Sequence, residues 1–191
     1  MTRVRPLTRS TADARRPVVV ARALAVFAHT GYYATRVSEV AAAAGISEAY
    51  VFRLFDDKLG LFLAALDHCF VQIVAAMVSG ADRAPSPAPA DVLGAMARAY
   101  AELIADRDLI ALQVHAQSAA VVPDIGAALR RGYETVVTFV QARSGADDAA
   151  VQRFMAYGQL CHLIATADLD AADAPWARVL TAGMHHPAKR Q

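Results

Sequence analysis

Two short helical segments joined by a three-residue turn with one glycine constrain this chain more than any other feature. Residues 37–43 and 48–55 carry apolar side chains at helical spacing, and Ala44-Gly45-Ile46 lies between them. Gly45 stands where a helix end takes the left-handed conformation that glycine adopts without strain, and Ser47 is a good N-cap for the second segment. The pattern predicts a helix-turn-helix, whose second helix can enter a DNA major groove.

The apolar residues of this unit would hold the two helices at a fixed angle; they are Val40, Ala41, Ile46, Val51 and Phe55. The opposite face of the second helix then presents Ser47, Glu48, Tyr50 and Arg53 outward. Glu48 would be repelled by phosphate. It could accept from a cytosine amine or point along the groove, and we favour the second.

Helix is also the expectation for the rest of the chain. The sequence has 44 alanines against 10 glycines and 8 prolines, and alanine has the highest helix propensity. No segment shows the alternation of a strand. Periodicity predicts further helices over residues 11–31, 58–78, 91–106, 107–121, 123–143, 147–169 and 175–184. We therefore predict an all-α fold of eight or nine helices, with Thr35 capping the helix that starts at Val37 and Asp56-Asp57 capping the one that starts at Lys58.

The two parts of the chain differ in the sign of their net charge, although the net charge of the whole chain is only +1. Residues 1–60 hold nine Lys and Arg against five Asp and Glu, and residues 61–191 hold ten against thirteen. We predict a flexible basic arm at residues 1–10, a helix-turn-helix domain at 11–60, a larger helical domain at 61–184 and a polar tail at 185–191. The basic end suits a polyanion such as DNA.

The composition indicates a soluble protein of a reducing, cytoplasmic compartment. Cys69 and Cys161 form no disulfide framework and no C-x-x-C motif. The N-terminal arginines are followed by no apolar signal segment. The most apolar stretch, residues 61–78, is interrupted by Asp67, His68 and Gln72, so we expect no membrane-spanning helix.

Residues 25–63 resemble the N-terminal DNA-binding domain of TetR-type transcriptional regulators. The resemblance rests on residue types at fixed spacing over about forty residues, namely Phe27, Gly31-Tyr32, Thr35, Val40-Ala41, Gly45-Ile46-Ser47, Phe52, Phe55, Lys58 and Leu61-Phe62. It implies a three-helix DNA-binding domain followed by a larger helical domain that binds an effector and dimerises.

The resemblance also implies which residues meet DNA: Thr35, Arg36, Ser47, Ala49, Tyr50, Phe52, Arg53 and Lys58. Thr35, Arg36 and Lys58 fall where the family contacts the phosphate backbone, and Arg53 could pair with guanine or with phosphate. Two positions depart from the family pattern. Phe52 replaces a tyrosine whose hydroxyl touches phosphate, and Tyr50 is bulky where a small residue is usual. Tyr32 and Phe55 are expected in the core, and Lys58 could instead be a solvated first-turn residue.

The larger domain resembles the family less specifically. Large or polar side chains on its apolar helices are candidates for an effector pocket: His68, Gln72, Met96, Tyr100, Gln113, His115, Gln117, Tyr133, Phe139 and Tyr157. Each could equally be a core residue with its polar atom satisfied. The adjacent pairs His68-Cys69 and Cys161-His162 point about 100° apart on a helix, so neither forms a metal clip, and no motif calls for a cofactor.

Dimerisation in this family uses the last two long helices. On residues 147–169 we expect an interface formed by Val151, Phe154, Met155, Gly158, Cys161, His162 and Ala165, together with part of residues 175–184. A two-fold dimer would place its recognition helices about 34–36 Å apart, on successive major grooves.

These features predict a ligand-responsive transcriptional repressor that releases a palindromic operator when a small molecule binds the larger domain. Two alternatives stay open. The departures at Tyr50 and Phe52 allow a helical interaction module that has lost DNA binding. An all-α enzyme is disfavoured, because the sequence shows no nucleophile paired with a base, no paired carboxylates and no phosphate-binding glycine loop.

Overall fold

The computed structural model describes the backbone of residues 8–183 and the side chains of residues 14–183. Residues 1–7 of the predicted arm and residues 184–191, which include the predicted tail, lie outside this range. Within it the chain is all-α, as predicted. The elements are α1 (Thr8–Ala34), α2 (Val37–Ala44), α3 (Glu48–Phe55), α4 (Lys58–Asp82), α5 (Pro89–Leu103), α6 (Arg107–Ser118), α7 (Pro123–Ser144), α8 (Asp148–Thr166), the 3₁₀ turn η1 (Leu169–Ala171) and α9 (Pro175–Thr181).

The helix boundaries follow from local signals, with two differences from expectation. α1 begins at Thr8, so the last three residues of the predicted arm are helical. Asp57 alone caps α4, accepting from the Gly60 amide at 2.7 Å, whereas Asp56 ends α3 with a positive φ of 61°. Prolines stand at the starts of α5, α7 and α9, where the missing amide proton has no helical partner to lose.

The α1 helix bends at Gly31, where the sequence predicts that it stops. Gly31 has φ 73° and ψ 176°, a conformation open to glycine and strained for other residues. A Cβ atom at this position would lie 2.7 Å from Nδ1 of His115 on α6. The bend therefore brings the α1–α2 connection directly against α6.

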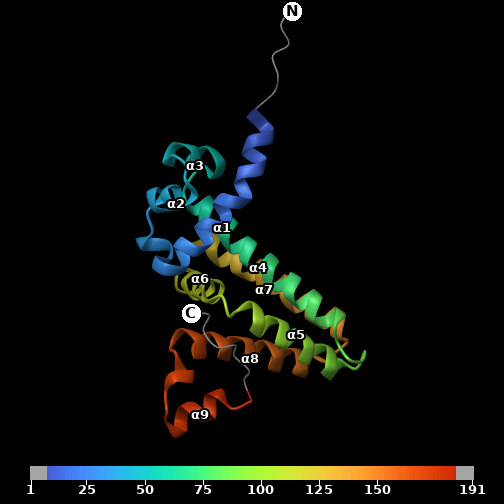
Figure 1. Cartoon of the computed structure of the whole chain (residues 1–191). Helices are drawn as coiled ribbons and strands as arrows, with labels where there is room; N and C mark the ends of the chain where they lie inside the picture. Colours follow the sequence, from blue (N-terminus) through green and yellow to red (C-terminus); the bar gives the residue numbers. More distant parts are fainter. Residues whose placement is uncertain (1–7, 184–191) are drawn as a thin grey trace, which may run out of the picture.

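The long α4 helix is the central element of the fold. It packs against α1 at one end and against α5 and α7 along its length (Figure 1). Its buried residues include Leu61, Phe62, Leu66, Phe70 and Ile73. Among the described helices, α4 alone is long and apolar enough to cross a membrane. Its position in the core accounts for that composition.

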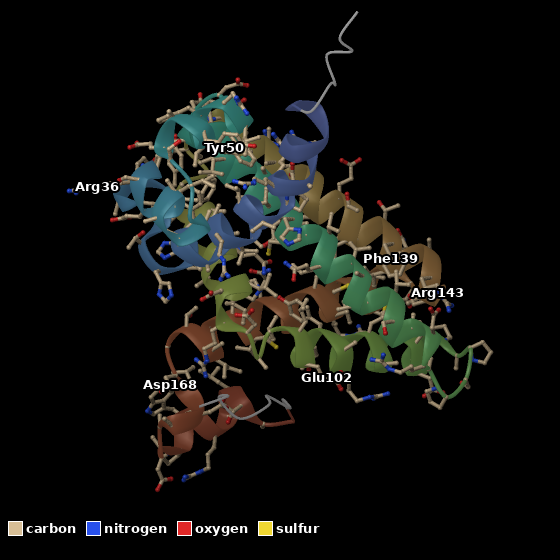
Figure 2. All side chains as sticks on the ribbon, turned by 45° about the horizontal axis from the view of Figure 1, so that its top comes forward. Arg36, Tyr50, Glu102, Phe139, Arg143 and Asp168 are labelled. Atoms are coloured by element: carbon tan, nitrogen blue, oxygen red, sulfur yellow. The ribbon has the colours of Figure 1, made fainter. Side chains whose placement is uncertain are left out.

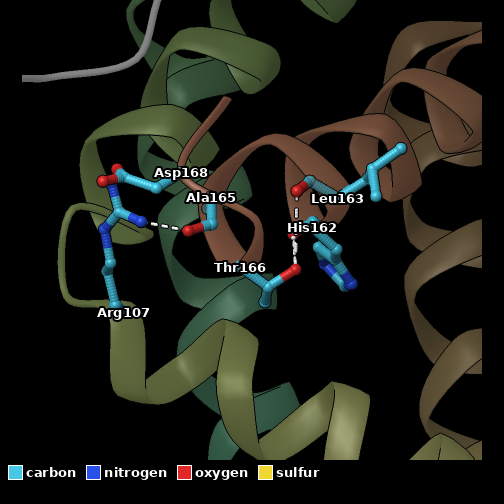
Figure 3. Close-up of polar contacts among 6 residues, drawn as sticks. All are labelled: Arg107, His162, Leu163, Ala165, Thr166 and Asp168. Atoms are coloured by element: carbon cyan, nitrogen blue, oxygen red, sulfur yellow. Dashed lines mark hydrogen bonds and ion pairs between the residues drawn. The ribbon is translucent and has the colours of Figure 1, made fainter. Parts of the chain in front are cut away.

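The helices divide by place in the molecule. Figure 1 shows α2 and α3 with α1 at one end, and α8 and α9 at the other. The α6 helix lies between these ends and packs against both α1 and α8. Arg107, the first residue of α6, reaches the end of α8, where it donates to the Ala165 carbonyl and lies 3.5 Å from an Asp168 carboxylate oxygen (Figure 3). α6 thus connects the helix-turn-helix end with the end formed by α8.

Candidate nucleic-acid interface and ligand cavity

The turn between α2 and α3 has the geometry that its sequence predicts. Gly45 adopts φ 64° and ψ 36°, and its amide donates to α2 carbonyls. The Ile46 amide donates to the Ala41 carbonyl at 3.0 Å. Ser47 caps α3, its hydroxyl oxygen accepting from the Tyr50 amide at 3.2 Å. The end of α2 and the start of α3 are therefore both fixed by local hydrogen bonds.

Packing fixes the orientation of α3 against α1 and α2. Val40, Ala41, Val51 and Phe55 are buried, as the helix-turn-helix reading predicts. Arg16 of α1 adds a contact that the sequence does not reveal, because its guanidinium carbon lies 4.3 Å from the centre of the Phe55 ring. The same side chain donates to the Leu54 carbonyl at the end of α3.

The outer face of α3 carries the residues expected to read DNA. Ser47, Ala49, Phe52 and Arg53 are exposed and Tyr50 is half-buried. The Arg53 guanidinium carbon lies 4.7 Å from the centre of the Tyr50 ring, a cation–π distance. Tyr50 therefore supports the arginine on this face, and Figure 2 shows it at the same end of the molecule as Arg36.

Thr35 does not occupy the place that the sequence suggests. Its side chain is 2% exposed, and its hydroxyl donates to the Gly31 carbonyl at 2.7 Å and lies 2.5 Å from the Thr30 hydroxyl. The prediction that Thr35 caps α2 was wrong. Arg36 is the N-cap residue, and its amide donates to Glu39 at 3.1 Å. Since the Thr35 hydroxyl is buried at the α1 bend, its side chain is not presented to DNA.

Two cationic side chains lie beside this unit. Arg36 is exposed and projects outward from the start of α2 (Figure 2). Lys58 is half-buried: its ammonium donates to the Tyr33 carbonyl at 3.1 Å and lies 5.0 Å from the centre of the Tyr32 ring. Lys58 thus ties the start of α4 to the end of α1. It is not the freely solvated lysine of the alternative reading.

A cavity of about 390 Å³ lies in the larger part of the molecule. α4, α5, α7 and α8 supply most of its walls, Gln113 of α6 contributes one side chain, and Ala182-Gly183 after α9 complete it. Most of the lining is apolar, with Phe70, Ile73, Met77, Val136, Phe154 and Met155. Such a cavity suits a small molecule.

Four of the predicted pocket residues line this cavity: Tyr100, Gln113, Tyr133 and Tyr157. The other six do not. Met96 is buried in the core, and His115 packs beneath Gly31. Gln117 is exposed and donates to the hydroxyl of the lining residue Tyr133 at 2.8 Å. His68, Gln72 and Phe139 are half-buried outside the cavity, and Figure 2 shows Phe139 near the far end of α7.

A buried polar pair lies beside the cavity. The Tyr100 hydroxyl and Nε2 of His162 are 2.8 Å apart, and both side chains are buried. Burial lowers the pKa of His162 to about 4 and raises the pKa of Tyr100, because the charged form of each is desolvated. Nε2 of neutral His162 can accept a hydrogen bond from the tyrosine hydroxyl, and its Nδ1 has no partner among the described residues.

Four residues of the predicted dimer face of α8 are unavailable to a partner, because Val151, Cys161, His162 and Ala165 are buried in the protomer. The other three, Phe154, Met155 and Gly158, are half-buried and line the cavity. The exposed apolar side chains of α8 and α9 are Tyr157, Leu163, Trp176 and Val179.

Most residues that line the cavity were not predicted, because the candidate pocket residues were chosen as large or polar side chains on apolar helices and most of the lining is apolar. Apolar lining residues and core residues share one inward helix face, so their pattern is the same. A usable signal was the spacing of Phe154, Gly158 and Cys161, which places them on the same side of α8. A glycine among large residues on an inward helix face leaves space that no side chain of that helix fills.

Comparisons with known proteins agree with this architecture. Residues 19–65 match the family model of bacterial regulatory proteins of the tetR family, and among curated proteins none matches the chain. A TetR-family protein of Streptomyces coelicolor has a similar solved structure, with TM-score 0.67 and 22% identity over 87% of this chain and 96% of its own. A transcriptional regulator of Pseudomonas aeruginosa gives TM-score 0.65 and 19% identity over 94% of this chain and 90% of its own.

A third similar structure is the transcriptional regulator FadR of Bacillus subtilis, solved in complex with stearoyl-CoA. Its TM-score is 0.67, with 15% identity over 88% of this chain and 99% of its own. At these identities the solved structures establish the fold. Residues 19–65 therefore carry a helix-turn-helix domain of the tetR-family type, and the chain as a whole shares the fold of these solved structures.

Proposed function

We propose that this regulator is a repressor that binds a palindromic DNA operator and releases it when a small molecule enters the cavity. The outer face of α3 carries the DNA-binding part of the proposal. Arg53 is held there on the Tyr50 ring, and Ser47 and Ala49 are exposed within the part of the chain that the structure describes. The departure at Tyr50 therefore supports a base- or phosphate-contacting arginine, and it favours DNA binding over the interaction-module alternative.

The phosphate contacts come from Arg36 and Lys58 in this proposal, with Arg53 reading bases. Arg36 is exposed at the N-terminus of α2, where the helix dipole also favours a phosphate. Lys58 donates one hydrogen bond to Tyr33, and an ammonium group has three donors, so two remain for DNA. Residues 11–60 form the DNA-binding unit, and residues 61–184 form the effector and dimerisation unit.

The connection between cavity and DNA-binding end runs through α6. Gln113 lines the cavity, and His115, two residues later, lies against Gly31 at the α1 bend. A ligand that shifts α6 would therefore displace the support of α2 and α3. An effector acts only if it binds the DNA-incompatible state more tightly than the DNA-bound state.

The operator must lie in the same compartment as the regulator, so we place the protein in the cytoplasm. We also propose a two-fold homodimer, with the interface on the exposed apolar residues of α8 and α9 rather than on the inward face predicted from the sequence. Leu163, Trp176 and Val179 are 49%, 57% and 76% exposed in the protomer. Apolar side chains gathered on two neighbouring elements mark an interaction surface.

Selection of bound sequences from a random duplex pool tests the proposal. We expect a palindromic site whose affinity falls steeply with salt, since phosphate contacts release counterions. An unrelated duplex of equal length is the control. A protein that enriches no sequence, and that shifts neither duplex at low salt, would instead be the interaction module.

A further inference from the structure

We infer that the cavity binds an amphipathic carboxylate, with its apolar body inside and its carboxylate paired with Arg98 at the rim. The inference rests on the proposed function, because it names the class of effector for the same cavity. It depends on three observations: the apolar walls, the single charge among the lining residues, and the hydrogen bonds already made by the interior polar groups.

The walls suit an apolar body of modest size. Aromatic and aliphatic side chains from α4, α7 and α8 form them, and Met77 and Met155 add flexible thioethers that adapt to ligand shape. The volume of about 390 Å³ lies toward the lower end of the range of about 300–1,000 Å³ for ligand pockets. A medium-length alkyl or arylalkyl group fits this space better than a large polar molecule.

Among the described residues that line the cavity, Arg98 of α5 is the one charged residue, and none is an aspartate or a glutamate. Arg98 is exposed. Among the described residues, the ion pairs use Arg83, Arg107, Arg143 and Arg178, so Arg98 has no acidic partner. A planar guanidinium can hold a carboxylate by two parallel hydrogen bonds. A cationic ligand would meet a like charge at this rim and no counter-charge inside.

Three neutral polar side chains of the lining, Tyr100, Gln113 and Tyr133, already have hydrogen-bond partners. Tyr100 pairs with His162, and the Tyr133 hydroxyl accepts from Gln117 at 2.8 Å and from Gln159 at 3.2 Å. Gln113 donates to the Leu109 carbonyl at 3.0 Å. Since these groups need no ligand to satisfy them, an apolar body can lie against them at little cost. The ligand's polar group is then best placed at the rim, beside Arg98.

Calorimetric titration of the full chain with matched probes tests this inference. The probes are straight-chain carboxylates from hexanoate to dodecanoate, the primary amides of the same chains, and the corresponding alkylamines. We expect the best carboxylate to bind about tenfold more tightly than its amide, as for a hydrogen-bonded charge pair at a half-open site. The amine should bind most weakly.

Three variants test whether Arg98 produces the preference for carboxylate and whether the probes bind in the cavity. Arg98→Gln should remove the preference for carboxylate over amide and leave amide binding unchanged, whereas Arg131→Gln, an exposed arginine that does not line the cavity, should change neither. Gly158→Leu should weaken both probes, because the added side chain points into open space at the cavity wall. Thermal unfolding of each variant confirms that it folds.

Three results would overturn the inference: equal binding of carboxylate and amide, an Arg98→Gln variant that keeps the preference, or no binding of any carboxylate. Fluorescence anisotropy of the selected operator with the same preparations separates the two proposals. Operator binding without carboxylate preference rejects the ligand class alone. Loss of operator binding by the unmodified protein rejects the proposed function.

Discussion

At the scale of single residues, the outer face of α3 depends on the pairing of Arg53 with Tyr50. The ring beneath the guanidinium restricts its conformations, which lowers the entropy lost when the arginine contacts a base or a phosphate. Tyr50 therefore acts by positioning Arg53, whether or not its own hydroxyl touches DNA.

Replacing Arg53 by alanine should weaken binding to the selected operator by about 1–3 kcal/mol, the range for a bidentate base contact, and relax the sequence preference at one position. Arg36→Ala should weaken binding to every duplex and lower the salt slope by about one. Binding titrations over a range of salt concentrations measure both. An Arg53→Ala protein with unchanged sequence preference would assign Arg53 to the backbone instead.

His162 gives the protein a dependence on pH. Burial lowers its pKa in the folded protein to about 4, below the value of about 6.5 in an unfolded chain. The unfolded state therefore binds more protons in this window. The stabilising contribution of neutral His162 is complete above pH 6.5 and is lost as pH falls toward 4, at up to about 1.4 kcal/mol per pH unit.

Chemical unfolding of the wild type and of His162→Gln between pH 7 and pH 4 measures this effect. The glutamine does not titrate, so the variant should lose less stability with acid than the wild type does. The difference between the two proteins removes the contribution of the carboxylates, which both share. Parallel curves would show that His162 does not titrate on unfolding in this range.

At the scale of elements, the contact between the α1 bend and α6 combines a strained backbone with close packing. Gly31 is held at φ 73°, and His115 fills the space where a side chain would start. Gly45 offers a comparison, because it has a similar φ of 64° and open space around it.

Gly31→Ala should therefore cost more stability than Gly45→Ala, which carries only backbone strain of about 1 kcal/mol. Adding His115→Ala should recover part of the loss at Gly31, through a coupling of about 0.5–3 kcal/mol, and recover none at Gly45. Denaturant unfolding of the wild type, the three single variants and the two double variants measures these terms. Additive costs for Gly31→Ala and His115→Ala would mean that the α1 bend and α6 are not in tight contact.

The same elements show what a sequence can and cannot predict. Gly45, Ser47 and Asp57 act through hydrogen bonds within a few residues, so their roles are readable from local sequence. The role of Thr35 depends on Thr30 and the Gly31 carbonyl at a bend whose direction local sequence does not specify. The buried residues Val151, Cys161, His162 and Ala165 of α8 were included in a predicted partner surface, because small and apolar residues have one pattern, whether they meet a second copy, a core or a cavity.

At the scale of the whole molecule, the N-terminal part of the chain differs in charge from the rest. The helix-turn-helix end, residues 1–60, is basic, with a net charge of +4. The apolar body, residues 61–191, is mildly acidic, with a net charge of −3. The cavity residues and the outer α3 residues lie on different helices, with α4 and α6 passing between the two regions.

The dimer is tested at this scale. The double variant Leu163→Lys and Val179→Lys should convert the protein from dimer to monomer in sedimentation at micromolar concentration. The reason is that two apolar side chains of the proposed interface are replaced by charged ones. Operator affinity should fall with it, since a monomer contacts one half-site. Val121→Lys is the control, because Val121 is 81% exposed but lies outside α8 and α9. A wild type that sediments as a monomer would contradict both the dimer and the palindrome.

Trp176 gives this molecule a built-in spectroscopic probe. It is the only tryptophan in the chain, and it lies on α9, far from α3, with 57% of its surface in contact with solvent. All indole emission therefore comes from one place, and its wavelength reports whether that place is wet or covered. If the proposed dimer forms through α9, dilution of the unlabelled protein shifts the emission toward the red as the two α9 surfaces separate. DNA added at the opposite end would contribute no indole signal of its own.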